Sequence, residues 1–137
     1  MRYLGLDLGT KTLGIAISDR TGMIASFYKS IRYSDEDFLI DSLREIILSL
    51  EVSVIVLGFP KNMDNSVGFR AKETLLFKEK LEVLGVPVVL EDERLTTTVA
   101  ESVLIDANMS RKKRKKVIDG VSAVVILQSY LDRKDRL

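Results

Sequence analysis

The chain contains no histidine, no cysteine and no tryptophan among its 137 residues. Without cysteine it can form neither a disulfide framework nor a thiolate zinc site. Without histidine it lacks the commonest general base and the Ser-His and Cys-His nucleophile pairs. Any catalysis therefore has to use carboxylates, lysine, hydroxyl groups, backbone amides or a metal ion held by oxygen ligands.

Long hydrophobic runs are also missing. Because no stretch of about 18 apolar residues occurs, we expect no transmembrane helix and no membrane partner. The N-terminus lacks the basic and apolar regions of a signal peptide, so we expect a cytoplasmic protein. With 46% apolar and 30% charged residues the chain is typical of a globular protein, and its length favours one domain over 1–137.

Excess charge of either sign is absent overall, since the formal net charge is +1. This value averages two unlike regions. Residues 111–137 hold nine Lys/Arg and three Asp/Glu, a balance of +6, so the rest holds 12 basic and 17 acidic residues, a balance of −5. A basic C-terminal region of this kind could contact phosphate groups.

The hydrophobic periodicity predicts an α/β fold. Short turns separate the first three expected strands, and helices separate the later ones, which gives a three-stranded antiparallel meander extended by two parallel strands. The expected strands are 3–8, 13–18, 23–31, 52–57 and 86–90, and the expected helices are 38–50, 67–84, 98–108 and 111–132. Helical spacing predicts that the inward side chains are Leu75, Leu76, Phe77, Leu81 and Leu84 in the second helix and Val117, Val121, Val124 and Leu131 in the last.

Sequence signals also predict where helices begin and end. Residues 34–37, Ser-Asp-Glu-Asp, supply a capping side chain and negative charge at the start of the first helix. Gly85 stands where a C-terminal capping glycine is expected after the second helix. Thr96 or Thr97 could cap the helix over 98–108.

Asp7 is the first candidate functional residue. It interrupts an otherwise apolar strand and is followed by Gly9, Thr10 and Lys11. Burying a carboxylate is costly unless it is paired or bound to metal, and Gly9 would let a phosphate or metal come close to the backbone. The alternative is an aspartate that only accepts backbone N–H bonds in its turn.

Two further groups of acids are candidates. Residues 91–94, Glu-Asp-Glu-Arg, follow the fifth expected strand, and ligands of open α/β sheets bind beyond the carboxyl ends of strands. The alternative there is a solvated strand end. Asp119 stands beside the apolar stripe of the last helix, where a surface salt bridge to Lys115 or Lys116 is the simpler interpretation.

Basic and polar residues provide candidate contacts to a polyanion. Six adjacent positive charges would bind phosphate backbones without sequence preference, although part of such a run on a helix is simply solvated. This basic run consists of Arg111, Lys112, Lys113, Arg114, Lys115 and Lys116. In the loop 58–66, Lys61, Asn62 and Ser66 could bond phosphate or sugar, or the loop could be only a connection.

These groups together point to metal-assisted phosphodiester chemistry. Three separate acids can converge on one or two hard cations, which then neutralise both the attacking and the leaving oxygen of a phosphodiester. In a chain without histidine, Mg²⁺ or Mn²⁺ held by oxygen ligands is the natural choice.

Five segments in order along nearly the whole chain resemble the YqgF/RuvX family. They are Leu-Asp-Leu-Gly-Thr-Lys at 6–11, Gly-Ile-Ala at 14–16, Gly-Phe-Pro-Lys-Asn-Met at 58–63, Asp-Glu-Arg-Leu-Thr-Thr at 92–97 and Lys-Lys-Val-Ile-Asp at 115–119. The resemblance implies a ribonuclease H-like fold, related to the resolvase RuvC, with helices on both faces of the sheet. It also implies a nuclease for the 5′ end of pre-16S rRNA, with Holliday junction resolvase as the older assignment.

The resemblance assigns roles to individual residues. Asp7, Glu93 and Asp119 match the family's metal-binding and catalytic acids, which would hold one or two Mg²⁺ or Mn²⁺ ions. Lys11, Arg94, Thr96 and the basic run would bind nucleic acid, either precursor rRNA or branched DNA, and a ribosomal particle is a candidate partner. Asn65 replaces the glycine usual in the family's loop, and asparagine tolerates left-handed backbone well enough to keep the loop's shape.

Two other functions have some support in the sequence. The strand ending Asp-x-Gly-Thr-Lys also resembles the first phosphate motif of actin-like and sugar-kinase ATPases, but those have two lobes and this chain has room for one. A non-catalytic RNA-binding module fits the basic run, although acids near a polyanion are unfavourable unless a metal neutralises them. The sequence leaves open whether the chain is a monomer or a homodimer, and whether RNA or DNA is preferred.

Overall fold

A five-stranded mixed sheet forms the centre of the protein. The computed structural model describes residues 1–60, 68–92 and 111–134, with only the helical backbone described over 111–120. The strands are β1 (Tyr3–Leu8), β2 (Thr12–Ser18), β3 (Ala25–Arg32), β4 (Val54–Phe59) and β5 (Val88–Asp92), in the spatial order β3-β2-β1-β4-β5. β1, β2 and β3 pair antiparallel, whereas β4 and β5 join parallel to β1. The expected meander with two parallel strands is confirmed.

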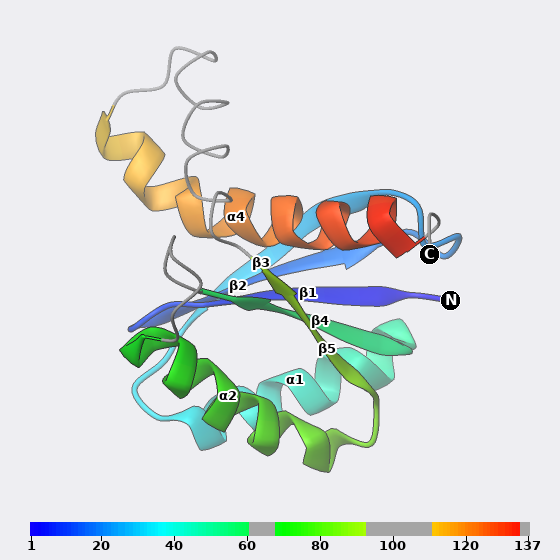
Figure 1. The fold of residues 1–137 in the computed structure, drawn as a ribbon, viewed down its shortest axis with the longest axis horizontal. Coiled ribbons are helices and arrows are strands. Elements are labelled where there is room, and N and C mark those ends of the chain that lie inside the picture. The colour runs from blue at the N-terminus through cyan, green and yellow to red at the C-terminus, as the bar shows by residue number, and fades with distance from the viewer. Residues whose placement is uncertain (61–67, 93–110, 135–137) are drawn as a thin grey trace.

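Helices cover both faces of this sheet (Figure 1). On one face lie α1 (Glu36–Leu50) and α2 (Phe69–Leu81), which continues into a 3₁₀ turn, η1 (Glu82–Leu84). On the other face lies α4 (Arg111–Lys134). The helix expected over 98–108 falls outside the described residues.

The ends of α1 and η1 follow the expected sequence signals. The Asp35 carboxylate caps α1 by accepting the Phe38 backbone N–H at 2.9 Å. Gly85 ends η1 in the left-handed conformation with a φ of 81°, which a residue with a side chain rarely adopts. Both signals work because they satisfy backbone groups that a helix end leaves without partners.

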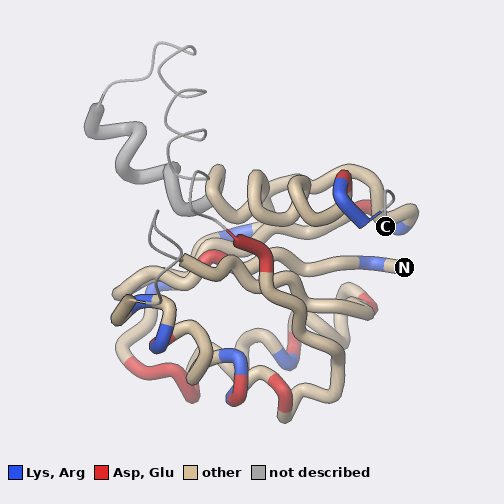
Figure 2. Tube along the Cα trace, in the orientation of Figure 1, with Lys and Arg blue, Asp and Glu red and all other residues tan. Residues whose placement is uncertain are grey.

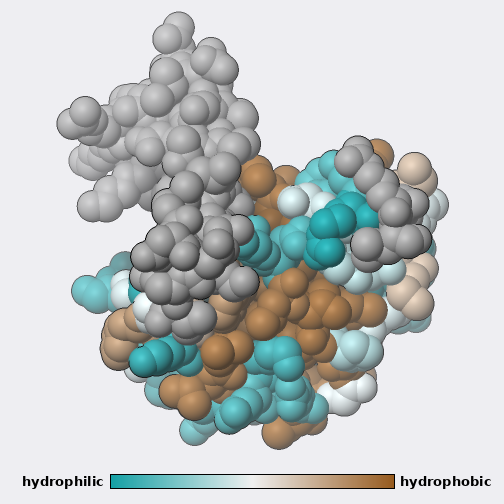
Figure 3. All heavy atoms as spheres, in the orientation of Figure 1, coloured by the Kyte–Doolittle hydropathy of each residue, from teal (hydrophilic) through white to brown (hydrophobic). Residues whose placement is uncertain are grey.

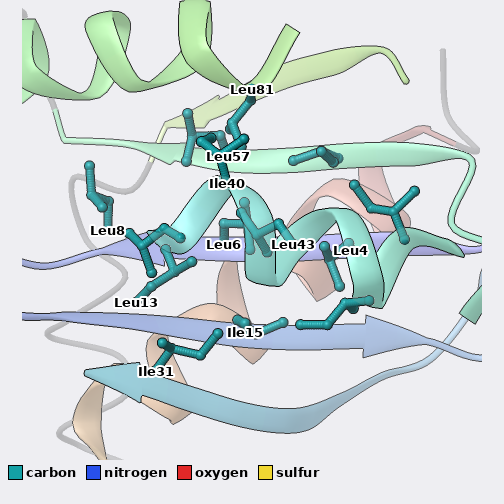
Figure 4. Packing of buried hydrophobic residues seen from close by; sticks show 14 of the residues in the cluster. Leu4, Leu6, Leu8, Leu13, Ile15, Ile31, Ile40, Leu43, Leu57 and Leu81 are labelled. Carbon is teal, nitrogen blue, oxygen red and sulfur yellow. The ribbon is translucent and has the colours of Figure 1, made fainter. Parts of the chain in front are cut away.

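Large aliphatic side chains fill the space between the sheet and α1 and α2 (Figure 4). Leu4 and Leu6 of β1 and Leu57 of β4 point toward Leu43 of α1, and all four are fully buried. Each buried side chain of this size contributes about 1.5–3 kcal/mol of transfer free energy. This cluster therefore supplies most of the hydrophobic stabilisation.

The opposite face packs α4 against smaller residues. A Cβ added at Gly5 would come within 2.7 Å of Leu127 Cβ and 3.2 Å of the Ala123 carbonyl oxygen. The missing side chain thus lets α4 approach β1 closely. Near the end of the helix, the rings of Tyr3 and Tyr130 contact each other with centroids 5.8 Å apart.

Three details of the sequence prediction were wrong. β4 and β5 each begin and end two residues later than expected, because the pairing between them continues to Phe59 and Asp92. Leu75 and Leu76 of α2 are exposed while Phe77 is buried, since each helical residue turns by about 100° and three in a row cannot share a face. In α4 the inward stripe is Ala123, Ile126, Leu127 and Leu131, whereas Val121 and Val124 are only partly buried.

Candidate active site

Asp7 lies at the carboxyl end of β1, on the face covered by α4. Its neighbours Leu6 and Leu8 belong to the aliphatic cluster on the α1 and α2 face, so the alternation of strand side chains turns Asp7 the other way. The residue is half-buried and is paired in register with Gly14 of β2. The protein thus presents a carboxylate at a strand end, between the sheet and a helix.

Contacts from two other elements hold the turn that follows Asp7. Arg70, in the first turn of α2, donates from Nη2 to the Leu8 carbonyl oxygen at 2.9 Å. The Tyr33 hydroxyl donates to the Gly9 carbonyl oxygen, and the Tyr33 backbone N–H donates to the Lys11 carbonyl oxygen at 3.0 Å. The turn that carries Asp7 and Lys11 is therefore fixed by side chains from β3's end and from α2.

The pKa of Tyr33 is consistent with its role as a hydrogen-bond donor to the Gly9 carbonyl oxygen. Burial raises the pKa of the Tyr33 hydroxyl, and the negative charges of Glu36 and Glu73 raise it further, while the Arg70 charge lowers it. The hydroxyl therefore keeps its proton at neutral pH and remains a donor to the Gly9 carbonyl. Lys11 is exposed, so its ammonium group is accessible to an anion.

A second carboxylate lies on the same face of the sheet at the end of β5. The strand registers place Leu6, Leu57 and Leu90 in one row across β1, β4 and β5. The next row toward the carboxyl ends contains Asp7 of β1, Gly58 of β4 and Glu91 of β5, and Gly58 is paired with Glu91. Two strand spacings separate β1 from β5, so the two backbones lie about 10 Å apart.

Glu91 is tied to α4 by an ion pair. Arg133, in the last turn of the helix, donates from Nη2 to Glu91 Oε1 at 2.7 Å. Only 7% of the Glu91 side chain is exposed, so the expectation that this strand end is merely solvated is wrong for Glu91. Figure 2 shows acidic positions at the end of β5, beneath α4.

The path of α4 places the Asp119 backbone toward the Asp7 end of β1. Tyr130 contacts Tyr3, and Leu127 lies over Gly5, so helix numbering falls as strand numbering rises. Asp119 stands eight residues before Leu127, about 12 Å back along the helix. The N-terminal turns of α4 lie on the side of the molecule where β1 ends, and they project away from the sheet (Figure 1).

Most of the predicted contact residues fall outside the description. Glu93, Arg94 and Thr96 come after the last described residue of β5, and Lys61, Asn62 and Ser66 come after β4. The side chains of Asp119 and of the basic run lie in the helical segment whose backbone alone is described. Asp7 and Lys11 are thus the two predicted site residues with described side chains.

Sequence reasoning missed Arg70, Tyr33 and Arg133. Each acts through a contact to a residue at least 24 positions away, so no local motif reveals it. Arg70 had one available signal, because it stands in the first turn of a helix that follows the loop after β4. In an α/β sheet that position adjoins the carboxyl ends of neighbouring strands.

The donor set at this end of the sheet fits a hard divalent cation. Asp7 offers carboxylate oxygens at a half-buried position, and a chain without histidine and cysteine offers only oxygen and amine groups. Among the described side chains no group of three acids is close enough to hold a metal ion. Glu93 and Asp119, the other two acids of the predicted site, have side chains that lie outside the description.

Comparison with known proteins identifies relatives over the whole chain. The family model described as "RuvX: Holliday junction resolvase" matches residues 1–133. A Geobacillus sp. (strain WCH70) protein is 55% identical over 137 residues, covering 98% of this chain and 99% of its own. A Bacillus subtilis (strain 168) protein is 53% identical over 135 residues, covering 96% and 98%. Both are named "Putative pre-16S rRNA nuclease".

Solved structures show the same fold at low identity. RuvC of T. thermophilus in complex with a Holliday junction substrate matches with a TM-score of 0.61 and 12% identity, covering 98% of this chain and 96% of that chain. The Fowlpox virus resolvase with Holliday junction DNA matches with a TM-score of 0.60 and 17% identity, covering 98% and 99%. No helix in the described part of the chain is long and apolar enough to cross a membrane. The chain has the ribonuclease H-like fold of these nucleases and belongs to the RuvX (YqgF) family.

Proposed function

We propose that this protein is a metal-dependent nuclease that hydrolyses phosphodiester bonds in structured nucleic acid, and that its substrate is the 5′ end of pre-16S rRNA. The observation that carries the proposal is the placement of Asp7. The carboxylate stands at the carboxyl end of the central strand and faces α4. The backbone then enters a turn that Arg70 and Tyr33 hold in place. The substrate follows from the names of relatives 53–55% identical to this chain.

Asp7, Glu93 and Asp119 would hold one or two Mg²⁺ or Mn²⁺ ions. Such ions neutralise charge on the phosphate and make water a stronger nucleophile. Asp7 would be oriented by its strand, and Asp119 by a helix that packs tightly on that strand through Gly5. This arrangement draws the ligands from rigid elements, which keeps their geometry constant during the reaction.

The positive charges of the chain would bind and orient the nucleic acid. Lys11 is exposed in the turn that follows Asp7 and would contact a phosphate near the cleaved bond. Arg94 and the basic run would bind more distant phosphates, which fix the position of the backbone without reading sequence. Lys61, Asn62, Ser66 and Thr96 would add hydrogen bonds to phosphate or sugar.

Cleavage of a Holliday junction is the second candidate function. It is favoured by the family description and by a fold shared with two resolvases bound to junction DNA. A two-fold symmetric junction would be cut most simply by a homodimer, whereas an rRNA end can be cut by a monomer. The two candidates therefore predict different oligomeric states as well as different substrates.

The experiment compares Asp7→Asn with the unmodified chain on both substrates, a precursor rRNA and a four-way DNA junction, with Mg²⁺ or Mn²⁺ present. Loss of a metal-binding carboxylate removes several kcal/mol of transition-state stabilisation, so we expect cleavage to fall about 100-fold or more. The matched control is Asp41→Asn, at an aspartate 77% exposed in a surface ion pair with Arg44.

The substrate that the unmodified chain cleaves decides between the two candidates. The control should cleave like the unmodified chain. Undiminished cleavage by Asp7→Asn would show that Asp7 takes no part in the chemistry, and no cleavage of either substrate by the unmodified chain would refute the nuclease proposal.

A further inference from the structure

A cavity of about 610 Å³ opens beside the carboxyl end of β5. β5 is the edge strand of the described sheet, and α4 passes over the cavity with its last turns. The lining residues are Phe59, Leu90, Glu91, Asp92, Ser129 and Arg133. None of them is among the residues to which the proposed nuclease mechanism assigns a role.

Glu91 has one carboxylate oxygen without a partner. Oε1 accepts the hydrogen bond from Arg133, but Oε2 is buried and has no hydrogen-bond partner in the described part of the chain. Only 7% of the side chain is exposed, so bulk water cannot freely supply the missing hydrogen bond to Oε2. A buried charged acceptor left unsatisfied is costly, so a ligand donor is favoured there once the Glu91 carboxylate turns to bring Oε2, which is covered in this structure, to the cavity.

The charges around Oε2 favour a neutral donor over a metal ion. The Arg133 guanidinium is bonded to the same carboxylate at 2.7 Å and neutralises most of its charge. A divalent cation at Oε2 would be repelled by this guanidinium at short range, which a neutral N–H group would not be. The complementary ligand atom is therefore an amino or imino N–H.

The other walls of the cavity suit a flat ring. Phe59 at the end of β4 is 6% exposed and Leu90 of β5 packs partly against the α1 and α2 cluster, so only the part of each residue that borders the cavity is apolar lining. Figure 3 shows apolar side chains gathered over β5 beneath the hydrophilic end of α4. A cavity of this size is within the range that binds small organic groups. Proteins that read single-stranded nucleic acid combine an aromatic surface with acceptors or donors for the base edge in the same way.

We propose that this cavity receives one unstacked nucleobase, which donates an N–H to Glu91 Oε2 and packs against Phe59 and Leu90. The inference rests on the proposed function, because it makes the cavity a specificity site for the same nucleic acid. β5 lies about 10 Å from β1, so the base would belong to the stretch of strand whose phosphate lies at Asp7.

The test uses two fluorescently labelled single-stranded RNA pentamers that differ only in the central base. One carries 2-aminopurine, whose amino group is a donor, and the other carries purine, which has no N–H on its ring edge. Binding to the full chain is measured by anisotropy. The unmodified protein should bind the 2-aminopurine pentamer about tenfold more tightly, the factor expected for a hydrogen bond to a charged acceptor. Equal binding of the two pentamers would overturn the inference without any variant.

Glu91→Gln makes the test specific to Oε2. Arg133 carries only donors, so it would keep the amide oxygen and leave the amide NH₂, itself a donor, in the place of Oε2. The preference for 2-aminopurine should then disappear. Glu51→Gln, which makes the same change in an exposed ion pair with Arg20, should keep the tenfold preference. A preference that persists in Glu91→Gln would overturn the assignment to Glu91.

These outcomes are independent of catalysis. A preference for the 2-aminopurine pentamer without cleavage of precursor rRNA would support base binding in the cavity and refute the proposed nuclease activity. Cleavage of precursor rRNA with equal binding of the two pentamers would support the proposed nuclease activity and refute base binding in the cavity.

Discussion

The two faces of the sheet are built from different side chains. Toward α1 and α2, the strands present Leu4, Leu6, Leu57 and other large aliphatic residues that are fully buried. Toward α4, the same strands present Gly5, Ala16 and the half-buried Asp7. The two faces alternate residue by residue along β1, because successive strand side chains point in opposite directions.

This difference separates stability from chemistry. Large aliphatic side chains bury the most apolar surface, so the α1 and α2 face holds the fold together. Small residues let α4 come close to the sheet, and that proximity brings carboxylates of the sheet within reach of side chains on the helix, as the Glu91–Arg133 pair shows. A substitution on the α1 and α2 face should therefore cost the most stability, whereas one on the α4 face should cost less stability and also change how the helix lies over the sheet.

The largest effect on stability is expected from Phe77→Ala on the α1 and α2 face. Phe77 of α2 is fully buried, and its truncation should lower the free energy of unfolding by about 3–5 kcal/mol. Chemical denaturation measures this loss. Phe69→Ala, at a residue 77% exposed in the same helix, should change stability by less than about 0.5 kcal/mol. Similar losses in the two variants would contradict the core described here.

Gly5→Ala tests the close approach on the α4 face. The new Cβ would lie 2.7 Å from Leu127 Cβ, so overpacking should cost about 1–3 kcal/mol of unfolding free energy. Adding Leu127→Gly removes the clashing Cβ itself and should make the two effects less than additive. Strict additivity in a double-mutant cycle would mean that the helix does not pack on Gly5.

Gln128→Met tests how α4 is attached to the β3 edge of the sheet. Gln128 Oε1 accepts the Ala25 backbone N–H at 2.9 Å, and Nε2 donates to the Met23 carbonyl oxygen at 2.9 Å. Losing these bonds should lower the unfolding free energy by about 1 kcal/mol. Gln128→Glu keeps the acceptor for Ala25 but turns an oxygen toward the Met23 carbonyl and places its charge beside Asp132 Oδ1, to which Nε2 also donates at 2.9 Å, so it should lose at least as much. A smaller loss in Gln128→Glu than in Gln128→Met would contradict this geometry.

The smallest effect is expected from Asp19→Asn, in the turn between β2 and β3. Hydrogen bonds from the Thr21 hydroxyl and from the Ile24 and Met23 backbone N–H groups lower the pKa of Asp19 to about 2. A lowered pKa stabilises the folded state above the unfolded-state value near 4, and this contribution is lost as pH falls through about 2. The stability difference between the two proteins should therefore shrink as pH is lowered from about 4 to 2. A difference that stays constant over that range would exclude the charge as its cause.

Much of the fold was predictable from local sequence signals. Tyr3–Leu8 was predicted with its observed bounds, and the residues that cap α1 and end η1 were recognised, because these features depend on a few neighbouring side chains. The bounds of β5 were not, since its last two residues are acidic and join the strand only by pairing with β4. Strand pairing is a tertiary interaction that hydrophobicity does not report.

The candidate site divides in the same way. The sequence by itself determined that histidine and cysteine ligands are absent, and it singled out Asp7 as a charge in an apolar strand. Only the tertiary structure decided that Arg70 and Tyr33 hold the turn after Asp7, and that Glu91 is buried against Arg133 with one oxygen unsatisfied. The physical reason is that a residue type sets which bonds a side chain can make, whereas the packing of distant elements sets which partners it meets.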